Sequence, residues 1–131
     1  MEFEGIGIDI VEIRRIEKLL RNRRFLQRVF TPAELEYCLA RSNPAPSLAA
    51  MFAAKEAVGK ALGSGVGVGR LRWKDVEVLE GKSGPQIKLN GRASEIFTRM
   101  RILLSLTHTA EISGAVVLLR CLLSEIEQFR K

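Results

Sequence analysis

The segment that most constrains how this chain can fold runs from Ser47 to Gly69 and reads SLAAMFAAKEAVGKALGSGVGVG. Alanine is the strongest helix former, Ser47 is a suitable N-cap residue, and glycine favours a helix end. The pattern therefore predicts a helix from about Leu48 to Leu62 that stops at Gly63. Because charged side chains are costly to bury in such an apolar segment, we expect the rest of the chain to be organised around this helix.

Three charged side chains lie within this alanine-rich helix. Glu56 and Lys60 stand one turn apart, on a flank that they share with small alanines. They form either an ordinary surface ion pair, worth about 0.2 to 0.5 kcal/mol, or part of a functional site that another molecule can approach closely. Lys55 projects into the apolar side, where it must extend to solvent or find a partner, since an unpaired buried charge costs several kcal/mol.

Four glycines follow the helix at every second position, from Gly63 to Gly69. They form either a helix cap followed by a flexible turn or a backbone cradle for a phosphate group. The run lacks the Lys-Ser/Thr ending of a P-loop, and it does not match the GxGxxG pattern of dinucleotide-binding proteins.

Size and charge limit the class of protein. A chain of 131 residues with 47% hydrophobic and 27% charged residues predicts one globular domain, residues 1–131. A net charge of +6 implies an acidic partner, which could be nucleic acid, an anionic membrane, a phosphorylated small molecule or an acidic protein. No apolar run has transmembrane length, and the N-terminus does not resemble a signal peptide, so we expect a cytoplasmic protein. Cys38 and Cys121 lack zinc-site spacing and are expected to be ordinary thiols.

The N-terminal segment predicts a short strand. Apolar residues alternate with Gly5 and Gly7 over Phe3–Ile10, which is typical of a strand that another backbone or a ligand approaches closely. Asp9 lies at its expected end. Its carboxylate is either the cap of the helix that follows or a metal ligand at the strand end.

An amphipathic helix is predicted from Ile10 onward, because Ile13, Ile16, Leu19 and Leu20 follow helical spacing. Its outer face and the loop expected after it are basic and almost free of acidic residues. They form either a solvated face or a docking surface for an anionic partner. The cations, with one aromatic residue among them, are Arg14, Arg15, Lys18, Arg21, Arg23, Arg24, Phe25 and Arg28.

The remaining elements follow from local signals. Thr31, Pro32 and Glu34 predict a capping box and a helix from Pro32 to about Ala40. Alternating residues around a Gly-Pro turn predict a hairpin of Trp73–Glu80 with Gln86–Leu89, and Trp73 is expected in the core. Further predicted elements are a short helix over Ala93–Met100, strands Ile102–Leu106 and Gly114–Leu119, and a C-terminal helix over residues 122–131.

His108 is expected in the segment Thr107–Ser113, which joins these two strands. A lone histidine is either a hydrogen-bonded structural residue or, at the end of a strand, part of a site.

Three of these segments together resemble one family. GIGIDIVEI, FAAKEAVGKALGSGVG and SLTHT, in this order and spacing, are similar to the motifs of the group I phosphopantetheinyl transferases, the holo-acyl-carrier-protein synthases. VFTPAEL resembles the start of the family's second helix. The match extends from about Phe3 to Leu119.

This resemblance implies an α+β domain with an antiparallel sheet packed against helices, assembled as a compact trimer with active sites between subunits. The family moves the phosphopantetheine arm of coenzyme A onto a serine of apo acyl carrier protein, releases adenosine 3',5'-bisphosphate and uses Mg²⁺. The partners implied are coenzyme A, an acidic carrier protein and further copies of the chain, in fatty acid biosynthesis. No nucleic acid or membrane is expected.

Roles for individual residues follow from their motif positions. Asp9 and Glu56 match the magnesium ligands, and Lys60 matches the lysine that contacts the phosphates. Glu56 is also the expected general base, directly or through a water, and Lys60 the second catalytic residue. The residues expected at coenzyme A are Lys60, Gly63, Gly65, Thr107, His108 and Thr109. Those expected at the carrier are Arg15, Arg21, Arg24, Phe25 and Arg28.

One departure concerns the residue before the FAAKE sequence. Members of the family commonly have arginine there, whereas this chain has Met51, so a phosphate or carrier contact is either missing or supplied from elsewhere.

Two rival hypotheses come from other classes. A nucleic-acid-binding module would use the basic first helix, but it would leave Asp9, Glu56 and Lys60 unexplained. A trimeric coenzyme A-binding protein would keep the fold without the activity.

Overall fold

The computed structural model describes residues 2–63, 65–67 and 71–122, with side chains from residue 5 onward. The predicted C-terminal helix over 122–131, apart from its first residue, and the last glycine of the run, Gly69, lie outside these described residues. Within the described part of the chain, no helix is both long and apolar enough to cross a membrane.

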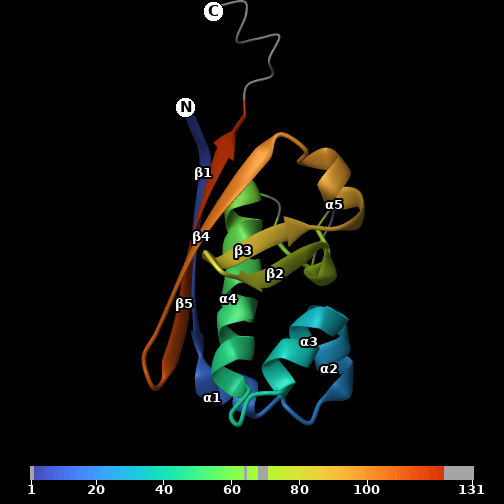
Figure 1. The fold of residues 1–131 in the computed structure, drawn as a ribbon, viewed down its shortest axis with the longest axis vertical. Helices are drawn as coiled ribbons and strands as arrows, with labels where there is room; N and C mark the ends of the chain where they lie inside the picture. The colour runs from blue at the N-terminus through green and yellow to red at the C-terminus, as the bar shows by residue number, and fades with distance from the viewer. Residues whose placement is uncertain (1, 64, 68–70, 123–131) are drawn as a thin grey trace, which may run out of the picture.

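Two antiparallel sheets and one central helix form the framework. The larger sheet has the strand order β1-β5-β4, and the smaller sheet is the hairpin β2-β3. The long helix α4 runs along one face of the larger sheet, and the hairpin and helices α2 and α3 lie on the other side of α4 (Figure 1). The strands are β1 (Glu2–Glu12), β2 (Val76–Gly81), β3 (Gly84–Leu89), β4 (Met100–His108) and β5 (Ile112–Cys121). The helices are α1 (Ile13–Glu17), α2 (Arg23–Val29), α3 (Pro32–Leu39), α4 (Ala45–Leu62), η1 (Trp73–Asp75) and α5 (Gly91–Ile96). The expected α+β class with an antiparallel sheet packed against helices is confirmed.

Helix α4 is almost entirely enclosed, which confirms its central place. It begins three residues earlier than predicted, with Pro44 as the N-cap residue, so Ser47 is not the cap. Proline is tolerated in a first turn, because the N–H groups there have no partner within the helix. Its end is as predicted, since Gly63 adopts the left-handed conformation with φ 75°.

The two glycines of β1 bring α4 close to the sheet. A Cβ atom at Gly7 would collide with the carbonyl oxygen of Ala57, and one at Gly5 with that of Ala61. This confirms the expectation that another backbone approaches the first strand. The contact places β1 and the second half of α4 against each other, so side chains on their facing surfaces can meet.

The buried charge in α4 finds a partner. The Lys55 ammonium lies 2.8 Å from a Glu34 carboxylate oxygen, and both side chains are fully buried. Lys55 also donates to the carbonyl oxygens of Trp73, at 3.0 Å, and Val76. Burial lowers the pKa of Lys55, while the Glu34 carboxylate opposes that shift. These contacts tie α3, α4 and the start of the hairpin together.

The N-terminal region departs from the prediction in two places. Strand β1 continues to Glu12, whose register partner in β5 is Ile112, so Asp9 lies inside the strand. The N-cap residue of α1 is Glu12, and the interpretation of Asp9 as a helix cap is therefore wrong. The basic loop expected after the first helix is largely a second helix, α2, whose N-cap Asn22 accepts a hydrogen bond from the Phe25 N–H.

The second half of the chain follows its local signals more closely. The capping box of α3 is present, with Thr31 and Glu34 each bonded to the other's backbone N–H. The hairpin pairs antiparallel as predicted, and Trp73 is half-buried with its ring stacked on Phe52 at 5.0 Å between centroids. The last two strands extend further than predicted. His108 pairs with Ser113 at the end of the β4–β5 ladder, so it lies on a strand and not in the turn.

Candidate active site

Asp9 of β1 meets Glu56 and Lys60 of α4, which are distant from it in sequence. The Lys60 ammonium donates to an Asp9 carboxylate oxygen at 3.2 Å and to the Ile8 carbonyl oxygen at 2.9 Å. Lys60 therefore bridges to the strand, and no ion pair with Glu56 forms within the described residues. The interpretation of Glu56 and Lys60 as an ordinary pair along one helix is wrong.

Glu56 completes this group, which we call the carboxylate site: Asp9, Glu56 and Lys60. The pKa of the Glu56 carboxyl is raised, first because the group is partly buried and second because the Asp9 carboxylate repels its charge. Lys60 and Arg15 act in the opposite direction. The two carboxylates thus lie near each other in a partly buried place where strand and helix meet, with the cations Lys60 and Arg15 nearby.

The donor set of the carboxylate site fits the Mg²⁺ that the family resemblance implies. Magnesium in proteins is commonly held by one or two carboxylates, with substrate phosphates and water as the other ligands. Among the described residues, no cluster of three or more His, Cys, Asp or Glu side chains is present, as a closed site for a softer metal would require. The repulsion that Asp9 exerts on Glu56 is the feature that a divalent cation would relieve.

The first two glycines after α4, Gly63 and Gly65, are exposed. Gly63 and Gly65 have φ values of 75° and 67°, and a Cβ atom at either position would have no other atom within 4 Å. The Gly65 N–H bonds back to the Gly59 carbonyl oxygen at 3.1 Å, which folds the segment over the end of the helix. Left-handed residues and free space are compatible with a phosphate cradle, which remains a prediction.

Two of the expected carrier-docking residues, Arg15 and Phe25, pack against Phe52 of α4. The Arg15 guanidinium lies 5.7 Å from the centroid of the Phe52 ring, and its effect on the pKa of Glu56 shows that it is near that carboxylate. Phe25 packs against Phe30 and Phe52, with centroids 6.1 Å apart in each pair. Arg21 and Arg24 are exposed on the turn before α2 and on α2 itself.

A shallow hollow extends this surface beyond the predicted residues. It has a volume of about 250 Å³ and is lined by Arg28, Gly67, Arg72 and Trp73. Phe52, Arg72 and Trp73 were not predicted at this surface. Phe52 lies on the apolar side of α4, which predicts a core position. Only the fold shows that the Arg15 guanidinium lies over its ring.

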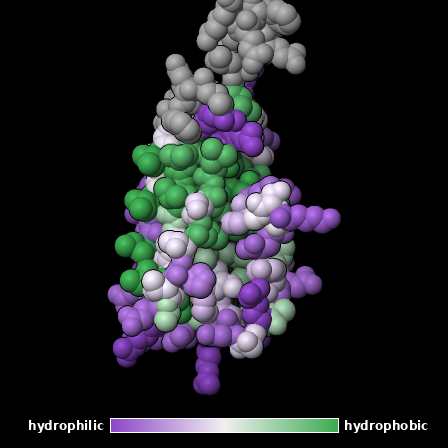
Figure 2. All heavy atoms as spheres, turned by 60° about the vertical axis from the view of Figure 1, so that its left-hand side comes forward, coloured by the Kyte–Doolittle hydropathy of each residue, from purple (hydrophilic) through white to green (hydrophobic). Residues whose placement is uncertain are grey.

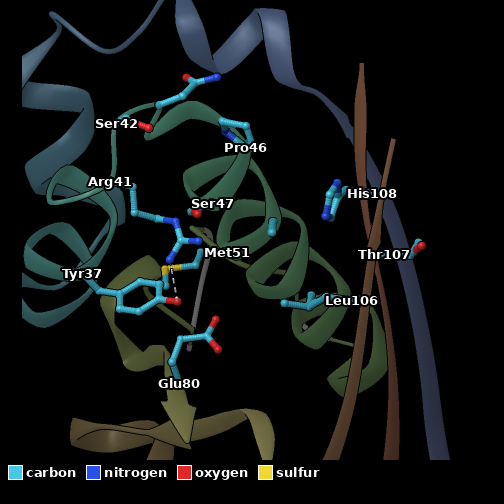
Figure 3. A pocket seen from close by; sticks show the side chains of 12 residues that line it. Tyr37, Arg41, Ser42, Pro46, Ser47, Met51, Glu80, Leu106, Thr107 and His108 are labelled. Atoms are coloured by element: carbon cyan, nitrogen blue, oxygen red, sulfur yellow. Dashed lines mark hydrogen bonds between the residues drawn. The ribbon is translucent and has the colours of Figure 1, made fainter. Parts of the chain in front are cut away.

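His108 lies in a different part of the molecule, in a cavity between the end of β4, the start of α4 and the end of α3. We call it the His108 pocket; its volume is about 430 Å³, and its lining includes Tyr37, Arg41, Ser47, Met51, Glu80 and His108. The imidazole of His108 and the guanidinium of Arg41 both point into this space, from opposite walls (Figure 3). Tyr37 and Arg41 were not predicted, because a single arginine before a proline-containing loop carries no recognisable signal.

The two threonines beside His108 are placed differently. The Thr107 side chain points away from α4, toward the other face of the sheet (Figure 3). The Thr109 hydroxyl accepts hydrogen bonds from the N–H groups of Glu111 and Ile112, at 3.2 and 3.1 Å, and so shapes the turn between β4 and β5. Their expected contacts with coenzyme A remain predictions.

Within one chain, therefore, the carboxylate site and the His108 pocket share no residue, although Asp9 and Thr107 both line another cavity of about 270 Å³ across β1, β5 and β4. Asp9 and His108 lie on strands that are separated by β5, and none of the three residues of the carboxylate site lines the His108 pocket.

Comparisons with known proteins agree with this architecture. Residues 5–116 match the model of a family described as the 4'-phosphopantetheinyl transferase superfamily. The chain is 48% identical over 124 residues to the holo-[acyl-carrier-protein] synthase of Moorella thermoacetica, which covers 91% of this chain and 95% of that relative. The crystal structure of the Neisseria meningitidis synthase aligns with a TM-score of 0.82 at 30% identity, covering 91% of this chain and 99% of the other.

A second solved relative carries a ligand. The Helicobacter pylori holo-[acyl-carrier-protein] synthase in complex with coenzyme A aligns with a TM-score of 0.77 at 34% identity, covering 88% of this chain and 99% of the other. The present chain belongs to the 4'-phosphopantetheinyl transferase superfamily and is an enzyme of that superfamily. The resemblance stated from three sequence motifs is confirmed.

Proposed function

We propose that this enzyme transfers the 4'-phosphopantetheine group of coenzyme A to a serine of apo acyl carrier protein and releases adenosine 3',5'-bisphosphate. The observation that carries this proposal is the meeting of Asp9, Glu56 and Lys60 between β1 and α4, with the Lys60 ammonium 3.2 Å from Asp9. The names of the relatives and the coenzyme A complex of one of them support the same substrates.

Asp9 and Glu56 would hold Mg²⁺, which when bound supplies positive charge to the diphosphate of the coenzyme. The serine oxygen of the carrier forms a bond to the phosphorus that bears the pantetheine arm, and the bond from that phosphorus to the leaving adenosine 3',5'-bisphosphate breaks. Glu56 accepts the serine proton, directly or through one water.

Lys60 stabilises negative charge on the diphosphate during transfer. The Lys60 side chain is about half exposed, at 53%, so it can reach a bound anion while its contacts with Asp9 and the Ile8 carbonyl hold its ammonium in place. Phosphoryl-type transfer depends mainly on positioning and charge stabilisation, and a preorganised ammonium contributes to both.

We also propose a closed trimer whose sites form between subunits. Ile6, Ile8 and Ile10 of β1 are 66%, 65% and 69% exposed and point away from α4. Figure 2 shows a continuous hydrophobic face in this region, and the β1–β5–β4 register adds Val116, Leu118 and Leu103 to it. A second copy that covers this face would remove the apolar surface from water and could bring the His108 pocket of one subunit to the carboxylate site of the next.

The cationic and aromatic residues around Arg15, Phe25 and Arg28 would receive the acidic carrier, with the cations guiding its approach. We place the reaction in the cytoplasm, where both substrates would be dissolved.

The test of the proposed function is a transfer assay read by mass spectrometry. The protein is incubated with coenzyme A, Mg²⁺ and an apo acyl carrier protein, and the carrier is expected to gain the mass of one phosphopantetheine arm only when all components are present. An unmodified carrier together with measurable binding of coenzyme A would instead identify a binding protein without the activity.

A further inference from the structure

We propose that Arg41 is a specificity-determining residue that binds the 3'-phosphate on the ribose of coenzyme A, and that Tyr37 positions it. This inference rests on the proposed function, because it names the part of that substrate which the His108 pocket takes. It concerns two residues that the motifs of the chain do not include.

Arg41 is held in place by a residue one turn earlier in the chain. Its Nη1 donates to the Tyr37 hydroxyl at 3.0 Å, and the guanidinium carbon lies 5.3 Å from the centroid of the Tyr37 ring. Both side chains are exposed, and Arg41 follows the end of α3. A guanidinium that is already stacked and hydrogen-bonded loses less conformational freedom when it binds a ligand.

The guanidinium is directed into the cavity and not along the surface. In Figure 3 it lies beside the sulfur of Met51, with Glu80 below it and His108 across the pocket. Among the described residues, Arg41 forms no ion pair, and only one of its guanidinium N–H groups has a protein acceptor. Four donors in a planar fork therefore remain for an oxygen-rich anion.

The other walls of the pocket favour the same ligand. Met51 is only 2% exposed, and its sulfur lies 3.6 Å from the buried Cys38 sulfur, so this wall is apolar and fixed. Arg41 is the only arginine or lysine among the described lining residues, and the hydroxyl of Ser47 and the imidazole of His108 can add donors. Met51 thus brings no positive charge to this cavity, but Arg41, which follows the end of α3, supplies one.

The two anionic groups of coenzyme A indicate which of them Arg41 would bind, namely the 3'-phosphate. The coenzyme has two anionic groups, the diphosphate and the phosphate on its ribose. The proposed function places the reacting diphosphate at the carboxylate site, with Lys60 and Mg²⁺. The ribose phosphate then needs a second cation away from the reacting bond, and the His108 pocket, which contains no residue of the carboxylate site, offers one.

The experiment compares coenzyme A with dephospho-coenzyme A, which lacks only the 3'-phosphate, as donors for the same carrier. For Arg41→Gln we expect the KM for coenzyme A to rise about tenfold or more, because a charge-assisted contact is lost. Its kcat and its KM for dephospho-coenzyme A should stay as in the wild type, so the preference for coenzyme A should largely disappear.

Three further variants sharpen the test. Arg41→Lys should restore part of the preference, since it keeps the charge without the fork, and Tyr37→Phe should reduce the preference by a smaller factor. Arg92→Gln, an exposed arginine on α5, is the matched control and should leave both donors unchanged. A merely structural role of Arg41 would affect both donors alike.

An equal rise in KM for the two donors in Arg41→Gln, or no change for either, would overturn the assignment of Arg41. A wild-type protein that modifies no carrier with either donor would overturn the proposed function instead. In that case calorimetric binding of the two coenzymes to wild type and Arg41→Gln still decides whether Arg41 recognises the phosphate.

Discussion

Lys55 and Glu34 form an ion pair at 2.8 Å between two side chains that solvent does not reach. Lys55 directly precedes Glu56 of the carboxylate site, and Glu34 comes from the capping box of α3. The pair therefore connects the start of α3 with the segment of α4 that carries Glu56, the proposed base.

Breaking this pair from one side should be strongly destabilising. We expect Lys55→Met to lower the free energy of unfolding by about 3 to 5 kcal/mol, because the Glu34 carboxylate would be left buried without its cation. The double variant Lys55→Met with Glu34→Gln should recover part of that loss, as measured by urea denaturation. A loss below about 1 kcal/mol in the single variant would contradict the interpretation.

Asp9→Asn and Glu56→Gln should each reduce phosphopantetheine transfer by orders of magnitude while leaving the fold and assembly intact. Each variant removes one carboxylate that is proposed to hold the metal, and Glu56→Gln also removes the base. Initial rates at saturating Mg²⁺ provide the measurement, with Glu95→Gln on α5 as a control carboxylate. Near-native rates in either site variant would show that the two-carboxylate site is wrong.

A single charge on the exposed isoleucine face should disrupt the proposed trimer. Ile8→Lys would place an ammonium in the centre of an apolar contact between copies, so sedimentation should show smaller species and activity should fall on dilution. Ile96→Lys, a partly exposed isoleucine of α5 away from that face, is the control. A fully active wild-type monomer at assay concentration would exclude the trimer.

Reversing the charge of the docking arginines should affect one substrate only. We expect the double variant Arg15→Glu with Arg28→Glu to raise the KM for the carrier about tenfold or more, because like charges repel across the contact. Added salt should raise the same KM in the wild type, because surface charges are screened over about 8 Å at physiological ionic strength. Arg21→Glu should act in the same direction. The KM for coenzyme A should change much less. Equal changes in the KM for both substrates would show that these arginines do not form the docking surface for the carrier.

The pH dependence of stability should reveal the buried thiol of Cys38. Burial raises the pKa of this thiol from 9.0 to about 12, so between these values the unfolded chain binds fewer protons than the folded one. Stability is therefore lost as the pH rises past 9, by about 1.4 kcal/mol between pH 8 and pH 10. The difference in unfolding free energy between wild type and Cys38→Ala should shrink by that amount between pH 8 and 10. A constant difference would mean that the thiol ionises normally in the fold.

Sequence alone predicted the features that depend on neighbouring residues. The capping box at Thr31 and Glu34, the end of α4 at Gly63 and the hairpin after Trp73 all follow from signals within a few positions. Helix α2 was not predicted, because it has only two buried apolar residues, Leu26 and Val29, among several arginines, and this is too short a pattern to indicate a helix.

Features that depend on distant partners could not be predicted in this way. The true ends of β1 and β4 are set by pairing with β5, and the partner of Lys55 lies 21 residues away in the chain. The motifs brought Asp9, Glu56 and Lys60 together correctly only through resemblance to a family. Arg41 and Tyr37 belong to no motif, so their place in the His108 pocket became visible only in the fold.

The glycines of β1 determine how near the reacting groups can be. Because Gly7 lets the carbonyl of Ala57 approach the strand closely, the Lys60 ammonium can reach both the Ile8 carbonyl and Asp9. Any larger residue at position 7 would push the helix outward and lengthen these contacts. Two residues that have no side chain therefore set the separation of the groups in the proposed site. A survey of inactive variants should identify these glycines together with the residues proposed to touch the substrate.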